Sequence, residues 1–405
     1  MTTTFRVVVI GGGYAGVMAA NRLRQRTDID VALVNPRQKF VERIRLHQLV
    51  AGNDDAVEDY ATILADGVRL IVDRAERIDT TTHQLRLASG STLDYDYLVY
   101  AVGSTAPAPA SVPGAAEFAY PLGELEAAQR LASRLSRRPM SEPIVIVGGG
   151  LTGIEAAAEF AEAGRLITLV TAALGPSLAS GGRQSVARRL KKLGVTVITD
   201  VTVARVGTES VTLSDGRALP STTTVWTAGF GVPTLATVSG LPTDNVGRLL
   251  TDETLTCVED PSIFAAGDTA SPSGVPLRMS CQYAIPLASH AADTVLARIA
   301  GTKPTTLNPA SGGQCIGLGR KAGTIQMSHL DDSPVPIHIG GRVAASIKES
   351  VCKGTLTFLA KEARKPGSYF WPRGGKRRKH LKKAAERRRS SDIALEDRSA
   401  SPSAN

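Results

Sequence analysis

The feature that most constrains the fold of this chain is a motif of strand, glycine turn and helix that occurs twice. Residues 7–23 read VVVIGGGYAGVMAANRL, and residues 144–160 read IVIVGGGLTGIEAAAEF. Each copy begins with a β-branched apolar run, typical of a buried parallel strand, and ends in an alanine-rich stretch typical of a helix. The glycines of the G-x-G-x-x-G pattern between them are Gly11, Gly13 and Gly16 in the first copy and Gly148, Gly150 and Gly153 in the second.

This pattern is suited to holding a dinucleotide. The first glycine allows a tight turn, the second lets the backbone approach a pyrophosphate, and the third lets the helix pack closely on the strand. The helix N-terminus then offers free N–H groups and a partial positive charge to the phosphates. A single copy is often only structural, but two copies predict an α/β protein with two Rossmann-like dinucleotide-binding domains.

Length and composition agree with this prediction. The 405 residues suffice for two domains and a small third region, and 42% hydrophobic residues with 39 glycines suit an α/β protein. No apolar run reaches the roughly 18 residues of a membrane span. The first predicted strand begins almost at once, without a secretory signal pattern, so we expect a cytoplasmic protein.

The cysteines exclude several classes of site. Cys257, Cys281, Cys315 and Cys352 are scattered, without a C-x-x-C pair. This spacing favours a reducing compartment and argues against a dithiol flavoenzyme of the glutathione-reductase kind. It also argues against a zinc site, and no metal is expected.

The ends of the second strands bear on nucleotide choice. Residues 28–35 and 165–171 are expected as the second strand of each unit, a place where an acidic residue often binds ribose hydroxyls. Here these positions are Asn35, which can still hydrogen-bond a hydroxyl, and Thr171. Without a carboxylate at 171 a 2′-phosphate is not repelled, so NADPH is not excluded, although no arginine cluster nearby favours it.

Five stretches together resemble the two-dinucleotide-binding flavoproteins of the pyridine nucleotide-disulfide oxidoreductase superfamily. They are VVVIGGGYAG, YLVYAVGS, IVIVGGGLTGIEAAAEF, VWTAGF and IFAAGDTA. Their order is most similar to type II NADH dehydrogenases and apoptosis-inducing-factor-like oxidoreductases, over roughly residues 5–372. The resemblance implies FAD as cofactor, NADH or NADPH as substrate, and an NAD(P)H domain inserted into the FAD domain. The expected regions are the FAD-binding domain at 1–115 and 246–310, the NAD(P)H-binding domain at 116–245, C-terminal strands with an amphipathic helix at 311–372, and a basic disordered tail at 373–405.

The resemblance also implies site residues. Those expected to bind FAD are Gly11, Gly13, Tyr14, Ala15, Gly16, Asn35, Arg43, Ala75, Gly103, Gly267, Asp268 and Gln282. Those expected to bind NAD(P)H are Gly148, Gly150, Leu151, Thr152, Gly153, Glu155, Thr171 and Gly229. Asp268 would accept a hydrogen bond from the ribityl or phosphate side of the flavin, and its alternative role is an ordinary helix N-cap. Gln282 and Glu155 are the candidates beside the flavin and the nicotinamide. The alternative role of Glu155 is to stabilise a helix N-terminus.

The implied function is oxidation of NAD(P)H through FAD, with electrons passed to a quinone-like acceptor. Pro286 stands where the family usually has a second glutamine, four residues after Gln282. One alternative is therefore a reductase of a small iron–sulfur protein of the ferredoxin type. The other is a slow-turnover, redox-sensing flavoprotein. The oligomeric state is not predicted.

The net charge of +9 is concentrated near the C-terminus, where residues 361–389 are dense in Lys and Arg. Before them, residues 343–363 carry apolar side chains near helical spacing, and three aromatic residues stand at 369–371. Aromatic side chains suit a membrane interface and basic ones bind anionic lipids, so we expect peripheral attachment to the inner face of the cell membrane. The alternative is a helix packed on the FAD domain and a solvated tail. Nucleic acid is not expected as a partner.

Overall fold

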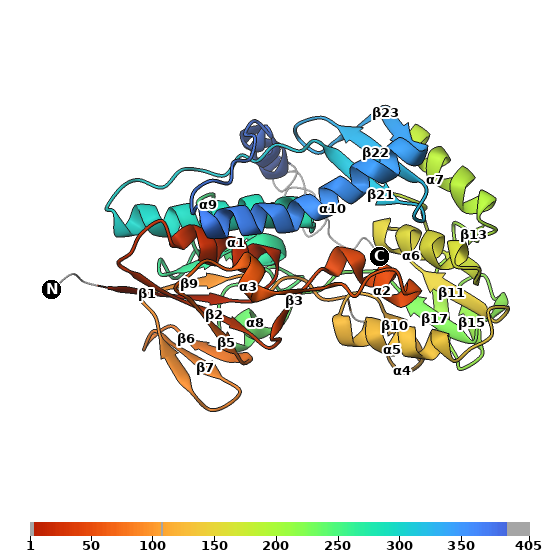
Figure 1. The fold of residues 1–405 in the computed structure, drawn as a ribbon, viewed down its shortest axis with the longest axis horizontal. Coiled ribbons are helices and arrows are strands. Elements are labelled where there is room, and N and C mark those ends of the chain that lie inside the picture. Colours follow the sequence, from red (N-terminus) through yellow and green to blue (C-terminus); the bar gives the residue numbers. More distant parts are fainter. Residues whose placement is uncertain (1–3, 107, 387–405) are drawn as a thin grey trace, which may run out of the picture.

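Two five-stranded parallel sheets frame the molecule (Figure 1), and four strands of each follow the same order. The computed structural model describes residues 4–106 and 108–386. The first sheet has the order β5-β2-β1-β9-β19 and the second the order β13-β12-β11-β17-β10, with all neighbouring strands parallel. The strands of the first sheet are β1 (Phe5–Ile10), β2 (Ile29–Asn35), β5 (Val68–Val72), β9 (Tyr97–Tyr100) and β19 (Ile263–Ala265). Those of the second are β10 (Ala119–Pro121), β11 (Pro143–Val147), β12 (Leu166–Val170), β13 (Thr196–Ile198) and β17 (Thr223–Trp226). In both sheets the strand before the glycine turn lies at the centre, so the predicted fold class is confirmed.

The two units also share their small antiparallel sheets. One such sheet lies between β5 and β9 in the chain, and the other lies between β13 and β17. Their strands are β6 (Ala75–Asp79), β7 (Gln84–Leu87) and β8 (Thr92–Asp94), and β14 (Val203–Val206), β15 (Ser210–Leu213) and β16 (Ala218–Pro220). Strand β19 joins the first sheet although the whole second sheet precedes it in the chain. The second unit is therefore inserted into the first, as expected.

Small residues set how the helices after the glycine turns pack. Helix α1 (Tyr14–Leu23) is buried along most of its length, because it lies between the first sheet and α9 (Cys281–Ile299). Its glycine and alanines allow this close approach. Helix α6 (Leu151–Glu162) buries its own run of alanines against the second sheet in the same way.

Short elements connect these parts. The helices are η1 (Arg43–Arg45), α2 (Leu46–Ala51), α3 (Tyr60–Ile63), α4 (Ala115–Phe118), α5 (Leu125–Ser136), α7 (Ser180–Lys192), α8 (Leu235–Val238) and η2 (Gly267–Thr269). The strands are the antiparallel pair β3 (Lys39–Val41) and β4 (Val57–Asp59), and the parallel pair β18 (Leu249–Thr251) and β20 (Ala270–Pro272). Residues of β3, η1, α3 and α8 line the cavity described below.

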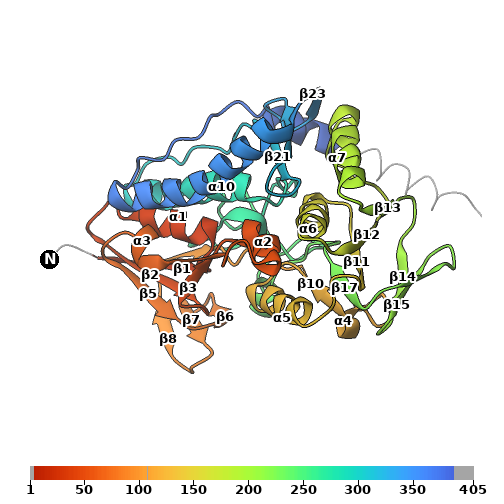
Figure 2. The same ribbon diagram turned by 45° about the vertical axis from the view of Figure 1, so that its right-hand side comes forward.

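The C-terminal part of the chain joins the two units. Strands β21 (Gly313–Gly317), β22 (Gly323–Ser328) and β23 (Pro334–Gly340) form an antiparallel sheet that packs on α6 and α7. From the end of β23, α10 (Gly341–Arg364) runs across this sheet to α1 of the first unit (Figures 1 and 2). The helix expected near 343–363 is present, and it reaches both units.

The basic segment after residue 373 differs in part from the expected disordered tail. Residues 377–386 are helical, and Arg377 is buried. Its guanidinium donates to both carboxylate oxygens of Glu253, at 2.9 Å each, and to the carbonyls of Pro272 and Val275. A buried charge needs such partners, and this pairing fixes the start of the tail on the body. The rest of the tail, residues 387–405, lies outside the described residues, and the domain boundaries stay predictions.

Candidate functional site

The first glycine turn has the geometry that a bound pyrophosphate requires. Gly11 has φ +103°, and a Cβ there would lie 2.3 Å from the carbonyl oxygen of Ala101. A Cβ at Gly16 would lie 1.6 Å from the carbonyl oxygen of Gly11, so α1 can pack this closely only with glycine. A Cβ at Gly13 would meet no atom within 4 Å. The open space at Gly13, at the N-terminus of α1, is where a ligand phosphate fits.

The second turn repeats these three roles. Gly148 has φ +117°, and a Cβ at Gly153 would lie 1.9 Å from the carbonyl oxygen of Gly148. A Cβ at Gly150 would again meet nothing within 4 Å. Gly229 follows β17, the parallel neighbour of β11, and has φ +81° and the same open space. The second unit therefore also fits a dinucleotide.

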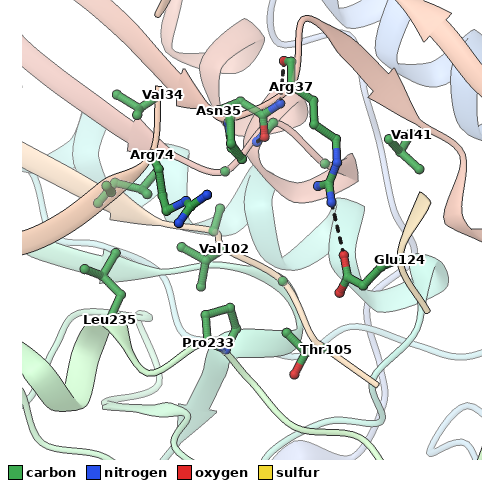
Figure 3. A pocket seen from close by; sticks show the side chains of 18 of the residues that line it. Val34, Asn35, Arg37, Val41, Arg74, Val102, Thr105, Glu124, Pro233 and Leu235 are labelled. Atoms are coloured by element: carbon green, nitrogen blue, oxygen red, sulfur yellow. Dashed lines mark hydrogen bonds and ion pairs between the residues drawn. The ribbon is translucent and has the colours of Figure 1, made fainter. Parts of the chain in front are cut away.

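A cavity of about 630 Å³ lies at the carboxyl ends of β1, β2, β5 and β9 (Figure 3). Ligands of open α/β sheets bind at this edge. The predicted FAD-binding residues that line it are Gly11, Gly13, Asn35, Arg43, Ala75 and Gly103. Its lining does not include Tyr14, Ala15, Gly16, Gly267, Asp268 or Gln282, nor any residue of the second turn. Tyr14 instead packs edge-on against Phe40, with ring centroids 5.0 Å apart.

Asn35 and Thr171 occupy corresponding positions in the two units, and each accepts a hydrogen bond from its glycine turn. Asn35 Oδ1 accepts a hydrogen bond from the Gly12 N–H (3.0 Å), and its Nδ2 donates to the Arg37 carbonyl (2.8 Å). Thr171 Oγ1 accepts from the Gly149 N–H (3.0 Å) and donates to the carbonyl two residues on (2.9 Å). Each side chain thus fixes its glycine turn. Asn35 keeps one N–H and one lone pair for a ribose, whereas Thr171 has used its only proton.

Asp268 links the cavity to the N-terminus of α9. Its Oδ2 accepts from Ser104 Oγ (2.7 Å), and its Oδ1 accepts from the backbone N–H of Ser280 (3.1 Å). Arg43 donates in turn to Ser104 Oγ (3.0 Å) and to the carbonyl of Gly123 (2.9 Å). The N-cap of α9 is Ser280 itself, so the alternative role of Asp268 as the N-cap of that helix does not apply.

Glu155 of α6 forms a buried ion pair with α10. Its Oε1 is 2.9 Å from Lys348 Nζ of α10 and accepts from the Gly317 N–H (2.8 Å). Burial alone would raise the pKa of Glu155, but the charge of Lys348 outweighs it and keeps this pKa below its ordinary value. Burial likewise opposes the charge of Lys348, yet Glu155 raises the pKa of Lys348 above its ordinary value. Burial lowers the pKa of the neighbouring His47 to about 4, so this imidazole is neutral at pH 7 while the pair is charged.

Gln282 belongs to a closed polar network at the start of α9. Arg278 donates to Gln282 Oε1 (3.3 Å) and forms a bidentate pair with Asp332 (2.7 and 3.1 Å). Gln282 Nε2 donates to Ser311 Oγ (3.3 Å), which donates to Asp332 (2.7 Å). The amide is therefore held in one orientation, while Pro286 is buried further along the same helix. Sequence reasoning missed Ser104, Lys348 and Arg278, because no local pattern marks them.

The chain is similar to several known proteins. Residues 5–294 match the family described as pyridine nucleotide-disulphide oxidoreductase. An NADH dehydrogenase-like protein of Mycobacterium tuberculosis is 32% identical over 324 residues, which cover 72% of this chain and 80% of that protein. A type II NADH:quinone oxidoreductase of the same organism is 29% identical over 356 residues, 75% of each chain. Among solved structures, the sulfide:quinone oxidoreductase of Aquifex aeolicus has a TM-score of 0.75 at 20% identity, over 89% of this chain and 92% of that one, and so shares the fold.

Proposed function

The chain belongs to the pyridine nucleotide-disulphide oxidoreductase family and is an FAD-dependent oxidoreductase, and we propose that it passes electrons from NADH or NADPH to a quinone-like acceptor. The observation that carries the proposal is the pair of glycine turns, each with open space at its second glycine, Gly13 and Gly150. The names of the relatives, NADH dehydrogenase-like protein and type II NADH:quinone oxidoreductase, support the donor and the acceptor.

The residues of the first unit fit FAD. The open turn at Gly13 and the N-terminus of α1 suit its pyrophosphate, Asn35 its ribose, and Asp268 the ribityl side of the flavin. When bound, FAD takes up a hydride from the nicotinamide and delivers electrons to the acceptor. The second unit, through Gly150 and Gly229, holds the nicotinamide nucleotide.

We assign two side-chain groups to the flavin end of the site, the ammonium of Lys348 and the amide of Gln282. Glu155 keeps Lys348 protonated at neutral pH, so Lys348 is a fixed positive charge rather than a proton donor. Together with the N-terminus of α9, this charge would stabilise negative charge that develops during reduction. Arg278 orients the amide of Gln282 beside the same helix start. Glu155 is in this assignment a positioning residue for Lys348.

The proposal also concerns the identity of the electron acceptor. The quinone is favoured by the relatives, whereas Pro286, inside α9, stands where the quinone segment of the family usually has a second glutamine. This apolar replacement favours, as the second candidate, a reductase of a small iron–sulfur protein. The third candidate is a redox sensor that is reduced rapidly and reoxidised slowly.

Anaerobic reduction of the purified flavoprotein followed by reoxidation separates these functions. We expect NADH to bleach the flavin absorbance and a short-chain quinone to restore it faster than a ferredoxin does. Recovery with ferredoxin alone would select the second candidate, and slow recovery with every acceptor would select the third. A flavin that neither NADH nor NADPH bleaches would contradict the assignment of the second unit. The ratio of the two reduction rates gives the nucleotide preference.

Attachment to an anionic membrane surface is a further part of the proposal. No helix in the described part of the chain is long and apolar enough to cross a membrane. However, α10 exposes Val343, Val351 and Phe358, spaced so that they share one face of the helix, and Phe370 beyond it is 80% exposed. The helical residues 377–386 add exposed lysines. Exposed apolar groups beside basic ones are what an anionic bilayer interface binds.

Vesicle co-sedimentation tests this attachment. Replacing Lys379, Lys382 and Lys383 with glutamine keeps the anchor at Arg377 and should weaken binding to anionic vesicles about 100-fold, since each basic residue near the surface contributes about 1 kcal/mol. Neutral vesicles should bind neither protein, and salt should weaken the native binding. Replacing Lys191 and Lys192, in the second unit, with glutamine is the matched control. If the native chain ignores anionic vesicles at low salt, attachment is contradicted and a soluble acceptor is favoured.

A further inference from the structure

Among the described residues, one cationic side chain that lines the cavity of the first unit has no hydrogen-bond or ion-pair partner. The cations that line the cavity are Arg37, Lys39, Arg43, Arg74 and Arg86. The partners of the other four are Glu126 for Arg37 (2.7 Å), Asp59 for Lys39 (3.3 Å), Ser104 for Arg43 (3.0 Å) and Glu76 for Arg86 (4.0 Å). Within residues 4–106 and 108–386, the guanidinium of Arg74 makes no hydrogen bond or ion pair, although it extends into the cavity (Figure 3). Its donors and its planar face are therefore available to a ligand.

The sheet register places Arg74 at the far end of the cavity from the pyrophosphate position. Val72, the last residue of β5, pairs with Asn35, and the N–H of Asp73 donates to the Asn35 carbonyl (3.1 Å). Arg74 is the next residue, at the end of β5, which lies two strands from β1. Neighbouring strands lie about 4.8 Å apart, so β5 is roughly 10 Å from β1 and from the turn at Gly13. A dinucleotide with its pyrophosphate at Gly13 and its ribose at Asn35 would bring its adenine to Arg74.

The surroundings of Arg74 suit an aromatic base rather than a second phosphate. Figure 3 shows Arg74 with Val34 above it and Val102 and Leu235 below it in that view, and all of them line the cavity. Asp73, the preceding residue, carries negative charge into the same lining, which would repel a phosphate. An aromatic ring gains from apolar walls and from a planar guanidinium on its face.

We propose that Arg74 stacks on the adenine ring of FAD and thereby contributes to affinity for the adenosine half of the cofactor. This inference rests on the assignment of the cavity to FAD. It adds a binding residue that neither the glycine pattern nor the Gly-Asp motif indicates. Arg74 is exposed in the absence of ligand, so its replacement should leave the fold intact.

Competition binding with the flavin-free protein tests the inference. FAD affinity is measured by fluorescence titration, and ADP and inorganic pyrophosphate are measured as competitors, for the native chain, Arg74→Gln and Arg74→Lys. We expect Arg74→Gln to weaken FAD and ADP by the same factor, about tenfold, and to leave pyrophosphate unchanged. Arg74→Lys should recover only part of this loss, because an ammonium lacks the planar face. Arg69→Gln is the control and should change none of the three, because Arg69 lies on β5 outside the lining of the cavity and already pairs with Asp30 at 3.0 Å.

Three results separate failure of this inference from failure of the cavity assignment. Unchanged FAD affinity in Arg74→Gln would overturn the stacking role while leaving the cavity assigned. Equal weakening of pyrophosphate would mean that Arg74 contacts phosphate, which also overturns it. If the native chain binds FAD but ADP does not compete, the adenosine half lies elsewhere and the cavity assignment itself fails.

Discussion

Replacing Asp268 with alanine should give a folded protein that purifies with little flavin. Asp268 accepts hydrogen bonds from Ser104 and from the N–H of Ser280, and through Ser104 it is connected to Arg43 in the cavity. Its loss frees the start of α9 and the Ser104 hydroxyl together. A hydrogen bond to a charged group contributes roughly 1.5–3 kcal/mol, so we expect FAD affinity to fall about 10- to 150-fold. Flavin absorbance per chain, before and after incubation with FAD, measures the effect.

A matched control for this variant is Asp244→Asn. Asp244 likewise accepts hydrogen bonds from a side chain, Arg248 at 2.7 Å, and from backbone N–H groups, but none of these partners lines the cavity, whereas Ser104, the partner of Asp268, does. We expect this control to keep its flavin. Ser104→Ala should fall between the two, because it removes the connection to Arg43 and leaves the contact with Ser280. If Asp268→Ala keeps its full flavin content and its affinity for FAD, the carboxylate stabilises the fold but does not contribute to FAD binding.

The parts of the site that could be predicted from sequence are those that local backbone geometry dictates. Gly11 and Gly16 each have a separate steric reason to be glycine, Gly13 leaves open space for a phosphate, and the spacing alone indicates all three roles. The buried strands were predictable for the same kind of reason, because β-branched apolar runs occur at the centre of parallel sheets. Such features place particular residue types at fixed, short spacings along the chain, so they can be recognised in the sequence.

The parts that could not be predicted depend on contacts between distant segments. Ser104 meets Asp268 across 164 residues, and Lys348 meets Glu155 only because α10 crosses from the C-terminal sheet to α1. The periodicity at 343–363 predicts a helix but not which of its polar residues turns inward. Arg377 looks like any other residue of a basic run until the structure places it against Glu253. The sequence of a basic run thus does not indicate which of its cations is buried.

Replacing Lys348 with methionine should have the second large effect, a loss of about 3–5 kcal/mol in the free energy of unfolding at pH 8. The change leaves Glu155 buried, with the Gly317 N–H as its remaining hydrogen-bond donor in the described structure. Methionine fills nearly the same volume, so the loss reports the unpaired charge rather than a cavity. Chemical unfolding of the flavin-free protein, followed by far-UV circular dichroism, measures it. Glu349→Gln, next to Lys348 and paired with Arg45 at a half-buried carboxylate, is the control and should cost less.

The dependence on pH identifies the cause of that loss. In the native chain the pKa of Glu155 lies below its ordinary value. The ion pair therefore stabilises the fold fully above about pH 4.5, which is the pKa of this carboxyl in the unfolded chain. This stabilisation is lost as the pH falls through the lower pKa of the folded chain. Without Lys348, burial should raise the pKa of Glu155 above its unfolded value, so the variant should lose stability as pH rises. The deficit of Lys348→Met should therefore grow from pH 5 to pH 8. Adding Glu155→Gln should recover most of it, since the buried charge is then gone. A deficit that is independent of pH and is not reduced in the double variant would show that lost packing of the lysine stem, and not the ion pair, holds α10 against the second unit.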